Sequence, residues 1–123
     1  MLSVALAPVG CGGGGDGKRD QAGVRECLAA EGMRIERPAG QANPALGSVS
    51  PDFRASLGGD AVDIVVEPSE KRARGSAADL HGALSTFGVP DPSARLQARG
   101  NVVAVFERDP GAAAREAVAG CLD

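Results

Sequence analysis

The chain has 123 residues and a formal net charge of −3 at pH 7, and aromatic residues make up 2% of it. This length accommodates one domain, whose core has to be built largely from aliphatic side chains. The basic residues are dispersed and no Tyr or Trp is present, which argues against nucleic acid as a partner. No apolar run reaches the roughly 20 residues of a membrane-spanning helix.

Residues 1–10 are mostly apolar and contain no charged side chain. Cys11 follows, and then the stretch Gly12–Gly17, whose composition is typical of a flexible linker. From Asp20 onward, apolar residues recur at the spacings of helices and strands. We therefore divide the chain into a signal-peptide-like segment over 1–10, a glycine-rich tether over 11–19 and a single folded domain over 20–123.

The order of apolar segment, small residue, cysteine and flexible spacer resembles the start of a bacterial lipoprotein. Gly10 and Cys11 match the end of the lipoprotein cleavage box, whereas Pro8 stands where Leu is usual and no Lys or Arg precedes Cys11. Either the true start lies upstream of Met1 or this segment is not a complete signal. The resemblance implies lipid attachment at Cys11 and a domain held at the extracytoplasmic face of the bacterial cytoplasmic membrane. The alternative for this segment is a cytosolic strand or a disordered end.

The glycine run has a second interpretation. Gly12–Gly17 contains the G-x-G-x-x-G spacing, and Glu36 follows at about the distance of a ribose-binding acid. Against a dinucleotide site, Pro8 and Gly10 interrupt the strand that should precede it. The chain also lacks the further alternating units of a full nucleotide-binding sheet.

The first helix of the domain is expected from an Asp20 cap to about Glu31, with Gly32 ending it. Its apolar residues Val24, Cys27 and Leu28 share one face. A short strand follows over 33–37, where Met and Ile alternate with charged residues.

The segment 39–60 is the least regular. Ser50-Pro51 is typical of a helix start, and the four-residue spacing of Phe53 and Leu57 fits one face of a short helix; a loose loop is the alternative. The clearest strand is expected over 61–67, with its apolar face on alternate residues and Asp63 on the wetter side.

The longest helix is expected to begin at Ser69 or Glu70 and to end at Gly88. Its apolar stripe consists of Ala73, Ala77, Leu80, Leu84 and Phe87. Strands over 95–99 and 102–107 form a hairpin around Gly100-Asn101. Asp109-Pro110 then starts the last helix, whose inner face carries Ala114, Val118, Cys121 and Leu122.

These elements predict an α+β fold: a two-layer sandwich with an about four-stranded mixed or antiparallel sheet and helices on one face. A ferredoxin-like arrangement is one candidate. Cys27 and Cys121 lie on the inner faces of the first and last helices, so we predict a disulfide between them if Cys11 carries lipid. The alternative is a pair of buried free thiols.

Few residues suggest chemistry. His81, the single histidine, is expected to face solvent or make a local contact, because one histidine does not make a zinc site. Glu67 and Glu107 end the two strongest strands and would approach each other if those strands were neighbours. The basic group at 71–74 is interpreted as a solvated face, with anionic headgroups or cell-wall polymer as the alternative.

The sequence therefore predicts an exported, lipid-anchored domain with a non-enzymatic binding or assembly role at the cell envelope. Its partner would be an envelope protein, a polymer or a small solute, with no cofactor, no metal and no catalytic residue assigned. The alternatives are a soluble nucleotide-binding protein that uses Gly12–Gly17, and a hydrolase whose site the sequence does not reveal.

Overall fold

The structure, a computed structural model, describes residues 19–37, 46 and 49–123. The signal-like segment, the cleavage-box residues and the glycine run lie outside these described residues. The described elements are, in chain order, α2 (Gln21–Ala30), β1 (Arg34–Glu36), β2 (Phe53–Leu57), β3 (Asp60–Val66), α3 (Glu70–Thr86), the 3-10 helix η5 (Pro92–Arg95), β4 (Leu96–Arg99), β5 (Val102–Phe106) and α4 (Ala112–Leu122).

The five strands form one sheet in the order β1-β2-β3-β5-β4, and every neighbouring pair is antiparallel. The predicted α+β class with an antiparallel sheet is confirmed, and the hairpin of β4 and β5 is found where it was expected. The narrower ferredoxin-like description stays a prediction.

The fifth strand is β2, and the prediction of a short helix or a loose loop there was wrong. Phe53 and Ala55 point into the core on alternate residues, which is the period of a strand. Gly58, at φ 65°, makes the tight turn from β2 into β3. The register places Arg54 opposite Asp63, so β2 joins the sheet with complementary charges facing each other across the pair.

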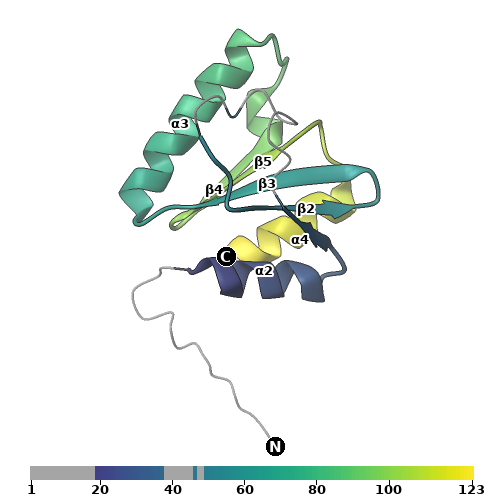
Figure 1. The fold of residues 1–123 in the computed structure, drawn as a ribbon. Coiled ribbons are helices and arrows are strands. Elements are labelled where there is room, and N and C mark those ends of the chain that lie inside the picture. Colours follow the sequence, from purple (N-terminus) through teal and green to yellow (C-terminus); the bar gives the residue numbers. More distant parts are fainter. Residues whose placement is uncertain (1–18, 38–45, 47–48) are drawn as a thin grey trace, which may run out of the picture.

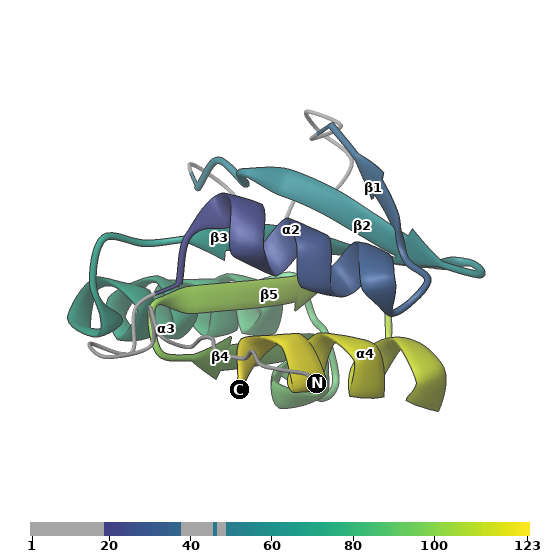
Figure 2. The same ribbon diagram turned by 90° about the horizontal axis from the view of Figure 1, so that it is seen from below.

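Helices cover both faces of the sheet, so the expected two-layer arrangement with helices on one face was wrong. Strand β5 shows why: Val102, Ala104 and Phe106 belong to the core cluster under α2 and α4. Its alternate residues Val103 and Val105 pack with Ala73 and Leu80 of α3 on the opposite face. Figures 1 and 2 show α2 and α4 side by side on one face and α3 alone on the other. A strand apolar at every position has to be covered twice.

The helix starts follow the capping residues of the sequence. The Asp20 side chain accepts a 2.7 Å hydrogen bond from the Gly23 amide at the start of α2, and the Ser69 hydroxyl accepts one of 3.1 Å from the Arg72 amide at the start of α3. Each bond satisfies an amide that the first turn leaves free. Both predicted N-caps are therefore confirmed.

The start of α4 differs from the prediction. The helix begins at Ala112 with Gly111 as its N-cap, not at Asp109-Pro110. No side-chain cap bonds the first turn of α4, but the Asp60 carboxylate accepts a 3.0 Å hydrogen bond from the amide of the N-cap residue Gly111. A contact between residues 51 positions apart leaves no local sequence signal.

The apolar stripe of α3 is shorter than predicted. Ala73, Leu80 and Leu84 are buried, but Phe87 is the C-cap residue and 64% of its surface is exposed. The chain turns away at Gly88, where φ is 81°, so Phe87 lies past the last turn that contacts the sheet.

Candidate functional site

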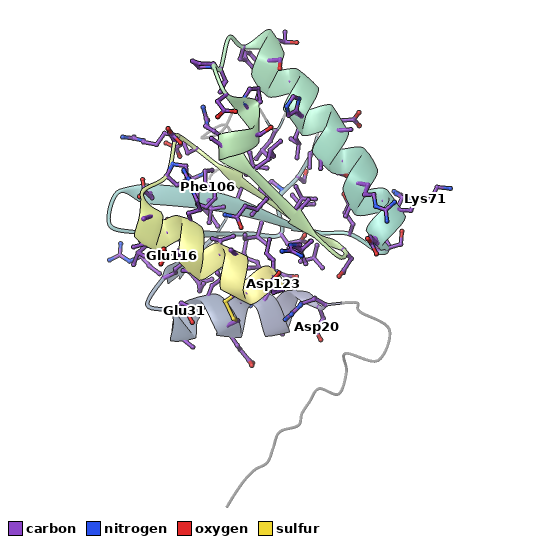
Figure 3. All side chains as sticks on the ribbon, turned by 180° about the vertical axis from the view of Figure 1, so that it is seen from behind. Asp20, Glu31, Lys71, Phe106, Glu116 and Asp123 are labelled. Carbon is purple, nitrogen blue, oxygen red and sulfur yellow. A yellow bond between two sulfur atoms is a disulfide. The ribbon has the colours of Figure 1, made fainter. Side chains whose placement is uncertain are left out.

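The structure brings Cys27 of α2 and Cys121 of α4 together on one face of the sheet. Their sulfur atoms lie 2.07 Å apart, at disulfide distance, with the Cα atoms 5.7 Å apart. Figure 3 shows this bond between the two helices. Cys121 is buried and Cys27 half-buried against the same core. The predicted pairing is thus compatible with the fold, and oxidation of the two thiols stays a prediction.

The other predicted site residue, Cys11, lies outside the described residues, as does the Gly12–Gly17 run. The structure describes the chain from Arg19, the last residue of the expected tether. Arg19 is anchored to the fold, because its backbone exchanges hydrogen bonds of 2.7 and 2.8 Å with the side-chain amide of Asn101.

A pocket of about 310 Å³ opens between α2, β1 and the start of β2. Its volume is at the lower end of the roughly 300–1,000 Å³ that ligand pockets commonly have, and the pocket is widely open to solvent. Sequence reasoning did not find it, because its walls come from three separate elements. It is lined by Arg25, Ile35, Glu36, Arg37, Asp52 and Phe53.

Two contacts hold the carboxylates of this pocket. Glu36 accepts a 2.9 Å hydrogen bond from the Ser56 hydroxyl, and Asp52 accepts one of 2.6 Å from the Val66 amide. The guanidinium of Arg25 lies over the Phe53 ring, 5.4 Å from its centre, which is a cation–π distance. The pocket therefore combines an apolar floor, two engaged acids and exposed guanidinium groups.

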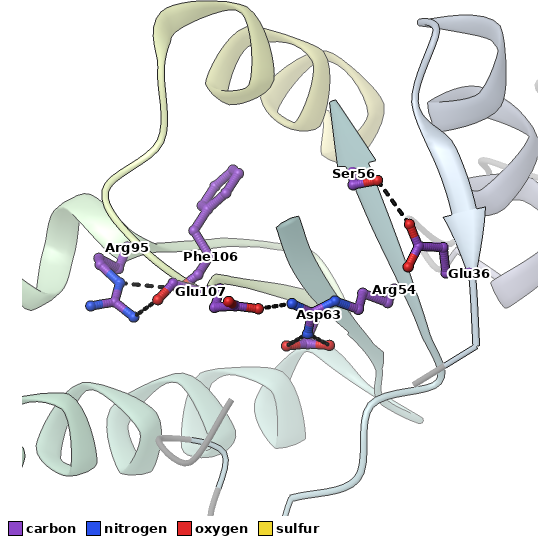
Figure 4. A network of polar contacts seen from close by, with 7 residues as sticks. All are labelled: Glu36, Arg54, Ser56, Asp63, Arg95, Phe106 and Glu107. Atoms are coloured by element: carbon purple, nitrogen blue, oxygen red, sulfur yellow. Dashed lines mark hydrogen bonds and ion pairs between the residues drawn. The ribbon is translucent and has the colours of Figure 1, made fainter. Parts of the chain in front are cut away.

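A second polar cluster lies on the α3 face of the sheet, around Arg54 (Figure 4). Its Nη1 donates to both carboxylate oxygens of Asp63, at 3.2 and 3.1 Å, and its Nη2 pairs with Glu107. The side chains of Arg54 and Asp63 are 8% and 1% exposed. The expectation that Asp63 faces a wetter side was therefore wrong, since its strand is covered on both faces.

Arg95 lies at the other end of this cluster, beside Phe106 and Glu107 (Figure 4). It donates from Nε to the Phe106 carbonyl at 3.1 Å and from Nη2 to the Glu107 carbonyl. Burial lowers the pKa of the Arg95 guanidinium from its usual value, and nearby Asp109 acts in the opposite direction. A guanidinium nevertheless stays charged in proteins, so the arrangement suits a structural lock on the end of β5 and not proton transfer.

The two strand-terminal glutamates do not form an acid pair. Their strands are neighbours, but they run antiparallel, with Val66 opposite Val102 at one end. Glu107 lies at the other end, where its amide donates to the Ala61 carbonyl at 2.9 Å. Glu67 instead accepts a hydrogen bond from Ser76. The expected approach of Glu67 and Glu107 was therefore wrong.

His81 is exposed, and its Nε2 lies 3.5 Å from the Ser93 hydroxyl, which confirms the predicted local contact. Within residues 19–37, 46 and 49–123, no group of three His, Cys, Asp or Glu side chains is placed to hold a metal ion. No helix in the same part of the chain is both long and apolar enough to cross a membrane.

The sequence matches no protein-family model, and neither the curated proteins nor the solved structures gave a match.

Proposed function

We propose that this chain is an exported, lipid-anchored domain that binds a partner at the outer face of the cytoplasmic membrane of a bacterium. The observation that carries the proposal is the position of Cys27 and Cys121 at disulfide distance between α2 and α4. Structural disulfides persist in oxidising compartments and are rare in the cytosol. A disulfide between Cys27 and Cys121, which lie near the two ends of the fold, therefore favours an exported protein.

The third cysteine supports the same proposal. With Cys27 and Cys121 paired, Cys11 is the odd thiol, and it follows an apolar segment and precedes the glycine run. Lipid attachment would account for its position and for the flexible spacer that follows. A soluble nucleotide-binding protein would need no such pairing and would use Gly12–Gly17 for phosphate contacts.

A binding role fits the charged groups better than catalysis does. Arg54, Asp63 and Glu107 are engaged with one another, and the acids of the pocket accept hydrogen bonds from Ser56 and the Val66 amide. General acid–base work needs a group of tuned pKa that is free to reach a substrate proton. The pocket beside β1 instead offers a concave surface, and binding sites are commonly concave.

Fractionation of the expressing bacterium tests this proposal. The full coding region, including any in-frame codons upstream of Met1, is expressed as wild type and as Cys11→Ala. We expect the wild type in the detergent-soluble membrane fraction and the variant in the soluble exported fraction. Cys121→Ala is the matched control, because it removes a cysteine without touching the anchor, and it should stay with the membrane. An equal distribution of wild type and Cys11→Ala would contradict the proposal.

A further inference from the structure

We draw no further inference here: the strongest candidate, the exposed surface patch formed by Lys71 and Arg72 at the start of α3, has the carboxylates of Glu67 and Glu70 beside it in the chain, and nothing in the structure shows what covers it.

Discussion

Asn101 reaches across 82 positions of sequence to hold Arg19, the first residue that the structure describes. Its side-chain oxygen accepts from the Arg19 amide, and its Nδ2 donates both to the Arg19 carbonyl and to the Glu67 carbonyl, at 2.8 and 2.9 Å. Asn101 is 2% exposed. One buried side-chain amide thus links Arg19, the end of β3 and the β4–β5 turn to one another.

Replacing Asn101 with Ala should therefore lower the free energy of unfolding by about 1–3 kcal/mol, because buried backbone groups lose their partners. Urea denaturation measures this loss, and hydrogen exchange at the Arg19 amide should accelerate in the variant. Gln97→Ala is the matched control, since that exposed amide makes one 3.2 Å bond to the Arg115 carbonyl. Equal stability of the two variants would show that the Asn101 contacts contribute little.

Among changes to the cysteines, loss of the Cys27–Cys121 bond should lower the free energy of unfolding most. The two residues are 94 positions apart, and for a loop of that order the chain-entropy model gives at most about 4–5 kcal/mol. Denaturation of oxidised and reduced protein measures the difference. In the double variant Cys27→Ala/Cys121→Ala, reductant should have no effect. A wild type whose stability does not change on reduction would contradict the prediction.

Arg54→Met should cost roughly 3–5 kcal/mol, the range for breaking a buried ion pair, because it removes the guanidinium that pairs with both Asp63 and Glu107. The double variant Arg54→Met/Asp63→Leu should be more stable than Arg54→Met alone, since the buried charge is removed with its partner. Thermal or urea unfolding of Arg54→Met and of the double variant measures this difference in stability. Arg74→Met, which breaks an exposed pair with Glu70, should cost no more than about 0.5 kcal/mol.

Phe87 and Leu84 lie three residues apart at the end of α3 but should respond differently to truncation. Leu84→Ala removes a fully buried side chain and should cost about 2–5 kcal/mol. Phe87→Ala should change stability by less than about 0.5 kcal/mol, because that ring is 64% exposed. Unfolding free energies of the two variants test the contrast, and a large cost at Phe87 would mean that the ring is covered in solution.

Local signals in the sequence were sufficient for most element boundaries. Asp20 and Ser69 accept hydrogen bonds from amides three residues on, and such caps depend on neighbouring residues only. The Gly100-Asn101 turn between β4 and β5 was predictable for the same reason, with Gly100 at φ 54°. The role of Asn101 in anchoring Arg19 was not predictable, because the hydrogen-bond partners of its side chain come from distant segments.

The strand β2 shows where such reasoning fails. Phe53 and Leu57 are four residues apart, and this spacing fits one face of a helix as well as alternate positions of a strand. Ala55 lies between them on the buried side, but a small residue gives a weak signal. What favours the strand is its pairing with β3, which places Arg54 opposite Asp63. Pairing across the sheet is a tertiary effect.

The pocket lay beyond prediction for a related reason. Arg25 comes from α2, Arg37 follows β1 and Phe53 begins β2, so only the fold brings them to one surface. The prediction that helices cover one face of the sheet was wrong for a related reason. The apolar run Val102–Phe106 fits a strand that is buried on one face as well as a strand that is buried on both. Only the placement of α3 decides that both faces are covered.

The central proposal, an exported and lipid-anchored domain, is tested most directly by the intact mass of the protein purified from the membranes of the cell that makes it. The proposal predicts a mature chain that begins at Cys11, carries a diacylglyceryl group and gains the mass of two hydrogen atoms when a reductant cleaves the Cys27–Cys121 bond. An unmodified chain that retains residues 1–10 and has three free thiols would contradict it.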